Sequence, residues 1–124
     1  MKLKQAIVLF AHGSRDADWA RPFEKICSAV ARELPGITVK LAYLDLMRPS
    51  LDEAIGMLAR EGVTKIRVVP LFFGLGGHVR EDLPRLVTRA NPGIDISIAP
   101  PIGEQAAVIE AIAAAIAAGN SAPR

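Results

Sequence analysis

The feature that most constrains the fold is a fourfold alternation between short apolar runs and longer segments with helical spacing. The first run, residues 5–11, is apolar at every position after Gln5, as in strands that are covered on both faces of a parallel sheet. Strands that alternate with helices along a chain predict such a sheet, joined by right-handed crossovers. We expect strands over residues 5–11, 37–44, 65–71 and 94–99, and helices over residues 17–33, 50–60, 79–90 and 104–118.

Capping residues and helix breakers mark the ends of these segments. Asp16 and Ser50 stand where helices need an N-cap, and Glu53 has the capping-box spacing from Ser50. Pro35-Gly36 and Asn91-Pro92-Gly93 are expected to end the first and third helices.

The length of 124 residues favours one α/β domain. We expect it to cover residues 1–118, as a four-stranded parallel sheet in the order 2-1-3-4 with helices on both faces, followed by a disordered tail over 119–124. The second run alternates and is placed near a sheet edge. The fourth alternates strictly, which predicts one wetter face.

Charge and composition argue against several kinds of partner. The net charge is only +2 and no long run of like charges occurs, so we expect no nucleic-acid binding. The most apolar segment, residues 106–118, is shorter than a membrane span and contains Glu110. The first apolar run is too short for a signal peptide. The single cysteine, Cys27, is expected to be a small core residue of a helix. We expect a cytoplasmic protein without membrane contact.

The only two histidines follow the first and third predicted strands. In the order 2-1-3-4 these strands are neighbours, and the strand order reverses between them, which is where open α/β sheets bind ligands. Neighbouring strands lie ~4.8 Å apart, so His12 and His78 can share one ligand. Asp45, at the end of the second strand, is a third candidate. Two imidazoles and a carboxylate suit a divalent metal ion such as iron, cobalt, nickel or zinc.

Each of these features also has a plain structural interpretation. A single loop histidine is often only solvated. The glycines near the histidines are either ordinary turn residues or leave room for a large planar ligand; they are Gly13, Gly74, Gly76 and Gly77. The apolar residues of the second loop belong either to the core or to the rim; they are Phe72, Phe73 and Leu75.

Four arginines fall in or just after the loops at this predicted edge, namely Arg15, Arg48, Arg80 and Arg85. They are either solvated side chains or a basic rim for a polyanionic substrate such as a polycarboxylate or a phosphate. The sequence supports these two interpretations about equally.

Taken together, these motifs resemble those of the sirohydrochlorin chelatase family, the small cobalt or iron chelatases of the CbiX/SirB type. The matching pieces span nearly the whole chain: His12-Gly13-Ser14-Arg15-Asp16, Leu44-Asp45, Arg48-Pro49-Ser50-Leu51, Val68-Val69-Pro70-Leu71-Phe72-Phe73, Gly77-His78-Val79, Asp82-Leu83-Pro84 and Ala99-Pro100-Pro101-Ile102-Gly103.

The resemblance implies a class II chelatase fold and a lyase that inserts Co²⁺ or Fe²⁺, with Ni²⁺ as a third candidate, into sirohydrochlorin for siroheme or cobalamin synthesis. It implies no permanently bound cofactor, since the metal is a substrate. His12 and His78 are the implied catalytic residues and, with Asp45, the implied metal ligands. The implied contacts to the tetrapyrrole are Ser14, Arg15, Arg48, Phe73, Gly76, Gly77 and Arg80. A homodimer is the implied assembly, with Phe72, Phe73, Leu75 and the alanine-rich last helix as candidate interface or cleft surface.

Two positions depart from the family pattern. Asp45 stands where glutamate is more usual, and Gly103-Glu104-Gln105 stands where a histidine is often found. The main alternative function is a non-catalytic carrier of metal or tetrapyrrole on the same scaffold. A phosphoryl-transfer enzyme with His12 as nucleophile is disfavoured, because Ala11 replaces the arginine of the Arg-His-Gly motif of histidine phosphatases.

Overall fold

Four parallel strands form one sheet in the order β2-β1-β3-β4 in a computed structural model that describes residues 4–90 and 93–120. The strands are β1 (Lys4–Ala11), β2 (Thr38–Tyr43), β3 (Val63–Pro70) and β4 (Asp95–Ile98). The helices are η1 (Ala17–Ala20), α1 (Arg21–Glu33), α2 (Leu51–Arg60), α3 (Gly77–Ala90), η2 (Ile102–Glu104) and α4 (Ala106–Asn120). The predicted sheet and its strand order are confirmed.

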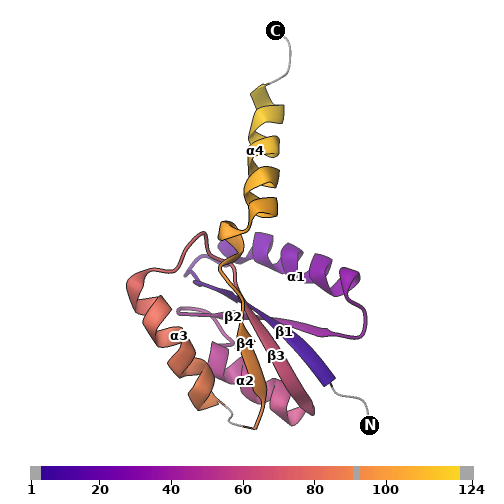
Figure 1. The fold of residues 1–124 in the computed structure, drawn as a ribbon, viewed down its shortest axis with the longest axis vertical. Coiled ribbons are helices and arrows are strands. Elements are labelled where there is room, and N and C mark those ends of the chain that lie inside the picture. The colour runs from indigo at the N-terminus through magenta and orange to yellow at the C-terminus, as the bar shows by residue number, and fades with distance from the viewer. Residues whose placement is uncertain (1–3, 91–92, 121–124) are drawn as a thin grey trace.

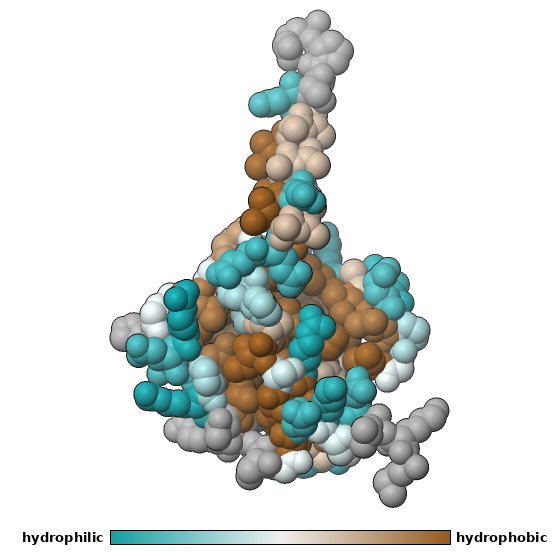
Figure 2. All heavy atoms as spheres, in the orientation of Figure 1, coloured by the Kyte–Doolittle hydropathy of each residue, from teal (hydrophilic) through white to brown (hydrophobic). Residues whose placement is uncertain are grey.

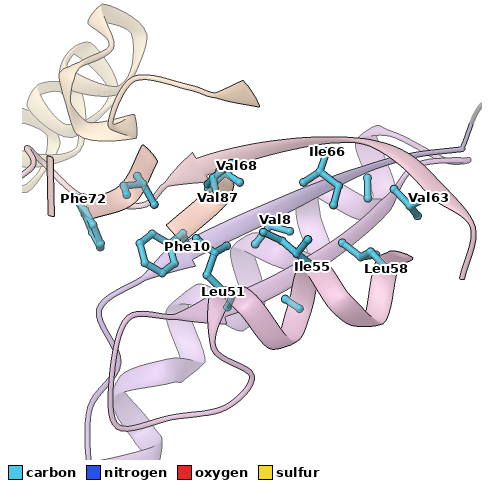
Figure 3. Packing of buried hydrophobic residues seen from close by; sticks show 14 residues of the cluster. Val8, Phe10, Leu51, Ile55, Leu58, Val63, Ile66, Val68, Phe72 and Val87 are labelled. Carbon is cyan, nitrogen blue, oxygen red and sulfur yellow. The ribbon is translucent and has the colours of Figure 1, made fainter. Parts of the chain in front are cut away.

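The sheet carries helices on both faces, as predicted (Figure 1). Alternate side chains of β1 point to opposite faces. Val8 and Phe10 pack with α2 and α3 in the larger core cluster, which Figure 3 shows from close by. Ile7 and Leu9 belong to a smaller cluster that includes residues of α1. β1 is therefore buried on both sides, which explains its continuous apolar run.

The observed ends of the elements lie close to those expected from the sequence. The side chain of Asp16 accepts a hydrogen bond from the Asp18 amide and caps η1. Ser50 and Glu53 form the predicted capping box at the start of α2. α4 extends through Asn120, two residues beyond the predicted end, and the rest of the expected tail, 121–124, lies outside the described residues. The predicted helix stop at 91–92 also lies outside them.

The first long helix covers its sheet face less completely than its apolar stripe predicts. In α1 no residue is fully buried, and Ile26, one of the apolar residues at helical spacing along this helix, is 42% exposed. Cys27 is half-buried rather than fully buried, and burial raises the pKa of its thiol. The physical reason is that α1 lies mainly over β2 at the sheet edge, so part of its apolar stripe extends past the sheet.

The last helix stands apart from both layers. α4 projects away from the sheet in Figure 1, and its main neighbour is the short turn η2 that precedes it. Every residue of α4 except Val108 is exposed. Among the described helices, none is long and apolar enough to pass through a membrane.

Candidate active site at the carboxyl edge of the sheet

Three loops meet where β1, β2 and β3 end. The Leu44 and Asp45 amides donate to the carbonyls of Ala11 and His12, at 2.8 and 3.0 Å. The Leu71 amide donates to the Phe10 carbonyl at 2.7 Å. These bonds extend the strand pairing by one or two residues, so the loops after the three strands lie side by side at one edge of the sheet, as the sequence predicts.

The His12 imidazole is stacked on the ring of Phe72. The ring centroids are 4.3 Å apart with an angle of 29° between the planes. Phe72 is buried and also contacts Phe10 of the core, with centroids 5.7 Å apart. His12 itself is exposed. A core aromatic ring therefore supports one face of an imidazole that stands at the rim. The sequence did not indicate this contact, because Phe72 and Phe73 are adjacent and only one of them turns inward.

Gly13 allows the loops after β1 and β2 to approach each other closely. Its φ is +95°, and a Cβ atom there would lie 1.8 Å from the carbonyl oxygen of Asp45. The carboxylate of Asp45 accepts a hydrogen bond from the Leu46 amide at 2.8 Å through Oδ1. Asp45 is exposed. The carboxylate thus lies at the predicted edge, with one oxygen bound to its own loop.

The backbone of His78 is at the second position of α3, directly after the loop that leaves β3. Its side chain lies outside the described part of the structure. The fold brings the loop that holds His12 beside the loop that leads to His78, while the pairing of the imidazoles stays a prediction. Among the described residues there is no group of three or more histidine, cysteine or acidic side chains placed to hold a metal ion.

Glycines in the loop after β3 leave open space. A Cβ atom at Gly76 or Gly77 would meet nothing within 4 Å, and neither residue has a positive φ. The fold itself therefore does not require glycine at these two positions. At Gly74 a Cβ atom would lie 3.6 Å from the carboxylate of Glu104, which places this acid beside the same loop.

The apolar residues of this loop divide between core and rim. Phe72 is core, Leu75 is half-buried, and Phe73 is 75% exposed. Gly103 lies against this loop, because its amide donates a hydrogen bond to the Phe72 carbonyl at 2.9 Å. A Cβ atom at Gly103 would lie 2.5 Å from Cα of Phe73. Sequence reasoning did not assign Gly103 this role; its position after two prolines was the only signal.

The polar residues predicted to bind substrate are held in different ways. Arg48 donates through Nε to Glu53 at 3.2 Å and also forms an ion pair with it through the terminal guanidinium nitrogen. Arg80 donates to the Leu75 carbonyl at 3.4 Å, so it braces the glycine loop. Ser14 accepts from the Asp16 amide at 3.1 Å, and Arg15 is exposed.

The ion pair with Arg48, followed by the hydrogen bond from the Ser50 amide, lowers the pKa of Glu53 from 4.5 to about 2. A carboxylate whose pKa is lower in the folded protein than in the unfolded protein contributes stability at pH values above its unfolded pKa. This contribution is lost as the pH falls through the folded pKa. We therefore expect the melting temperature of the parent protein to fall more steeply between pH 5 and pH 2 than that of Glu53→Gln, measured by circular dichroism. Gln keeps a capping-box acceptor.

Asp52→Asn is the matched control, because it removes a carboxylate from the same helical turn. Its pH profile should follow that of the parent protein. Parallel profiles for the parent and Glu53→Gln would show that the ion pair does not couple folding to pH.

A sequence model of the family described as CbiX matches residues 6–118. A sirohydrochlorin cobaltochelatase from Methanopyrus kandleri is 37% identical over 82 residues, which are 66% of this chain and 57% of that protein. One from Saccharolobus solfataricus is 33% identical over 106 residues, 78% of this chain and 81% of that protein. The match therefore spans little more than half of the first relative.

Solved structures of similar proteins have the same fold. A CbiX protein from Marinobacter aquaeolei superimposes with a TM-score of 0.83 and 34% identity, over 93% of this chain and 96% of that one. The sirohydrochlorin chelatase SirB from Bacillus subtilis, in complex with cobalt, superimposes with a TM-score of 0.81 and 27% identity. The superposition covers 94% of this chain but 51% of SirB. SirB with Fe³⁺ superimposes with a TM-score of 0.82 and 25% identity, over 98% of this chain and 49% of SirB.

Proposed function

This chain belongs to the CbiX family, and from that membership we propose that it is a chelatase that inserts a divalent metal ion into sirohydrochlorin. Relatives named sirohydrochlorin cobaltochelatase and the cobalt complex of SirB favour Co²⁺ as the metal, and SirB with iron makes Fe²⁺ the next candidate. Ni²⁺ is the third, on the chemistry of imidazole ligands alone. The observation that carries the proposal is the exposed His12 imidazole, supported by Phe72 beside an open glycine loop.

The reaction needs a base beside the macrocycle. Insertion of a metal(II) ion displaces two protons from pyrrole nitrogens, and a side chain within hydrogen-bond reach must accept them. We assign both tasks, delivery of the metal and acceptance of protons, to His12 and His78. A neutral imidazole has one nitrogen lone pair that can serve either purpose. Asp45 is the third proposed metal ligand, through the oxygen that does not accept from Leu46.

The surface around His12 suits a flat molecule that carries carboxylates. The space above Gly76 and Gly77 admits the face of a macrocycle, and the exposed ring of Phe73 offers it an apolar contact. Arg15, Arg48 and Arg80 are exposed cations for its carboxylates, and Ser14 is a further polar contact. To bind a carboxylate directly, Arg48 has to share its guanidinium with Glu53.

We propose a homodimer as the functional unit. SirB is about twice as long as the matched region of this chain, so two copies of this chain supply a comparable length. One copy alone presents the rim as an open edge with Phe73 exposed. A second copy across this edge would form a cleft wall and remove that apolar surface from water.

The direct test is to incubate the purified protein with sirohydrochlorin and Co²⁺, Fe²⁺ or Ni²⁺ in turn. A chelatase removes the spectrum of the free macrocycle faster than the buffer control, and the three rates rank the metals. Tight binding of sirohydrochlorin with insertion at the uncatalysed rate would instead identify a carrier, the alternative on the same scaffold.

A further inference from the structure

Leu46 combines two features that a stable fold normally avoids. Its φ is +69°, and it is the only residue other than glycine with a positive φ in the part of the chain that the structure describes. Such a φ is a steric outlier for a bulky side chain. The side chain is also 54% exposed, so burial of apolar surface does not offset the strain. Backbone strain of this kind is concentrated at functional sites.

The strain belongs to a tight turn in the loop after β2. The Met47 amide donates to the Asp45 carbonyl at 2.9 Å, across Leu46 alone. With a positive φ at the central residue, this bond closes the rarer and more strained form of the γ-turn. The Leu46 amide in turn donates to Oδ1 of Asp45 at 2.8 Å. Two short-range hydrogen bonds therefore hold Leu46 in its strained conformation.

The rest of this loop is held against the neighbouring strand ends. The Asp45 amide donates to the His12 carbonyl at 3.0 Å, and the Asp45 carbonyl oxygen lies where a Cβ atom on Gly13 would be only 1.8 Å from it. At the other end of the loop, the Tyr43 amide donates to the Pro49 carbonyl at 2.9 Å. The segment between these two residues is thus a short closed loop, tied by its backbone to the loop that holds His12.

Exposed apolar side chains gather at this edge of the sheet. In the described residues, the large ones lie on the projecting helix α4, whose apolar surface Figure 2 shows, at α1, and at the carboxyl edge: Ile109, Ile112 and Ile116; Ile26 and Leu34; and Leu44, Leu46 and Phe73. In the order β2-β1-β3, Leu46 and Phe73 lie in the loops on either side of the His12 loop. Neighbouring strands lie ~4.8 Å apart, so these two loops are about 10 Å apart, comparable to the width of a tetrapyrrole ring.

We propose that Leu46 contacts the tetrapyrrole, at the edge of the macrocycle opposite the one that meets Phe73. The strained turn holds the leucine in place before the substrate arrives, so less loop and side-chain entropy is lost on binding. The four pyrrole nitrogens lie at the centre of the macrocycle, and contacts at two opposite edges place that centre over His12. The inference rests on the chelatase function proposed above and adds an apolar residue to its substrate site.

The test uses a variant that removes the side chain and the strain together. Leu46→Gly relieves the positive φ, so its melting temperature should equal or exceed that of the parent protein, by up to ~5 °C. It should bind metal-free sirohydrochlorin at least about 10-fold more weakly, as expected when a buried leucine contact is lost. Leu46→Met keeps an apolar side chain and should bind within about threefold of the parent protein. The measurement is the change in macrocycle fluorescence as protein is added.

Leu34→Asn is the matched control. It removes another exposed leucine, at the end of α1 just before β2 begins, and so at the opposite edge of the sheet. Its affinity for sirohydrochlorin should equal that of the parent protein. In steady-state insertion of Co²⁺, Leu46→Gly should raise KM for sirohydrochlorin about 10-fold and leave kcat nearly unchanged, because a contact made equally in the ground and transition states affects binding alone.

Three results with the variant would overturn the inference and leave the chelatase function standing. The first is parental affinity of Leu46→Gly for metal-free sirohydrochlorin. The second is a fall in kcat at unchanged affinity, which would show that the turn only positions Asp45. The third is a loss of affinity together with a smaller mass in light scattering, which would assign Leu46 to a contact between copies. A parent protein that does not bind sirohydrochlorin would overturn the proposed function and this inference together.

Discussion

Replacing His12 with alanine is expected to reduce the rate of metal insertion into sirohydrochlorin by at least ~100-fold, since a positioned acid or base typically contributes 10²–10⁴. His12→Ala removes an exposed ring that is supported by Phe72, so the core remains filled and the melting temperature should change little. His78→Ala should have a similar effect on the rate. The measurement is the initial loss of the free macrocycle absorbance with Co²⁺, minus the rate in buffer.

The double variant provides a sharper test than either single change. If both imidazoles act on the same metal ion and macrocycle, the losses should be far from additive. Arg32→Ala is a suitable control, because it truncates an exposed side chain in the last turn of α1 and keeps both histidines and every proposed substrate contact. Parental rates in both histidine variants would exclude the pair as the reactive site, while the fold assignment would be unaffected.

Gly13→Ala is expected to have the largest effect on stability of any single methyl added to the site. The residue has φ +95°, and the new Cβ would lie 1.8 Å from the Asp45 carbonyl oxygen. Strain of this kind, together with a backbone clash, costs about 2–4 kcal/mol. A loss of that size lowers the melting temperature by roughly 10 °C in a domain of this length. Metal insertion should fall as well, because the loops that hold His12 and Asp45 are pushed apart.

Gly76→Ala is the matched control for this prediction. It adds the same methyl group to a loop at the same edge, where nothing lies within 4 Å and φ is not positive. Its melting temperature should equal that of the parent protein. If Gly13→Ala melts like Gly76→Ala, the close approach of the two loops does not contribute to stability.

The sheet could be predicted from the sequence because its pattern is local and repeated. Burial on both faces makes β1 apolar throughout, and exposure at the edge makes β4 alternate. Ser50 and Glu53 likewise predicted the start of α2, because a capping box depends on two residues that are only three positions apart.

Other features depend on distant contacts and were not predictable. Two adjacent phenylalanines give no sign that Phe72 turns inward to meet His12 while Phe73 faces out. The pairing of Arg48 with Glu53 crosses a loop–helix boundary, where spacing has no fixed geometry. The apolar composition of α4 predicted a helix, but composition carries no information about which surface that helix covers.

The position of Phe72 has a consequence for how this protein can change over evolutionary time. One side of the ring contacts Phe10 in the interior, and its other neighbour is the His12 imidazole at the surface. We therefore expect a substitution that repacks the interior near Phe10 to shift the imidazole as well, and a change of the ring beneath the imidazole to alter the packing of the interior. If His12 binds the metal ion as proposed, selection for heat tolerance and selection for a different metal ion would both act on the Phe72 side chain, and the two traits would be coupled.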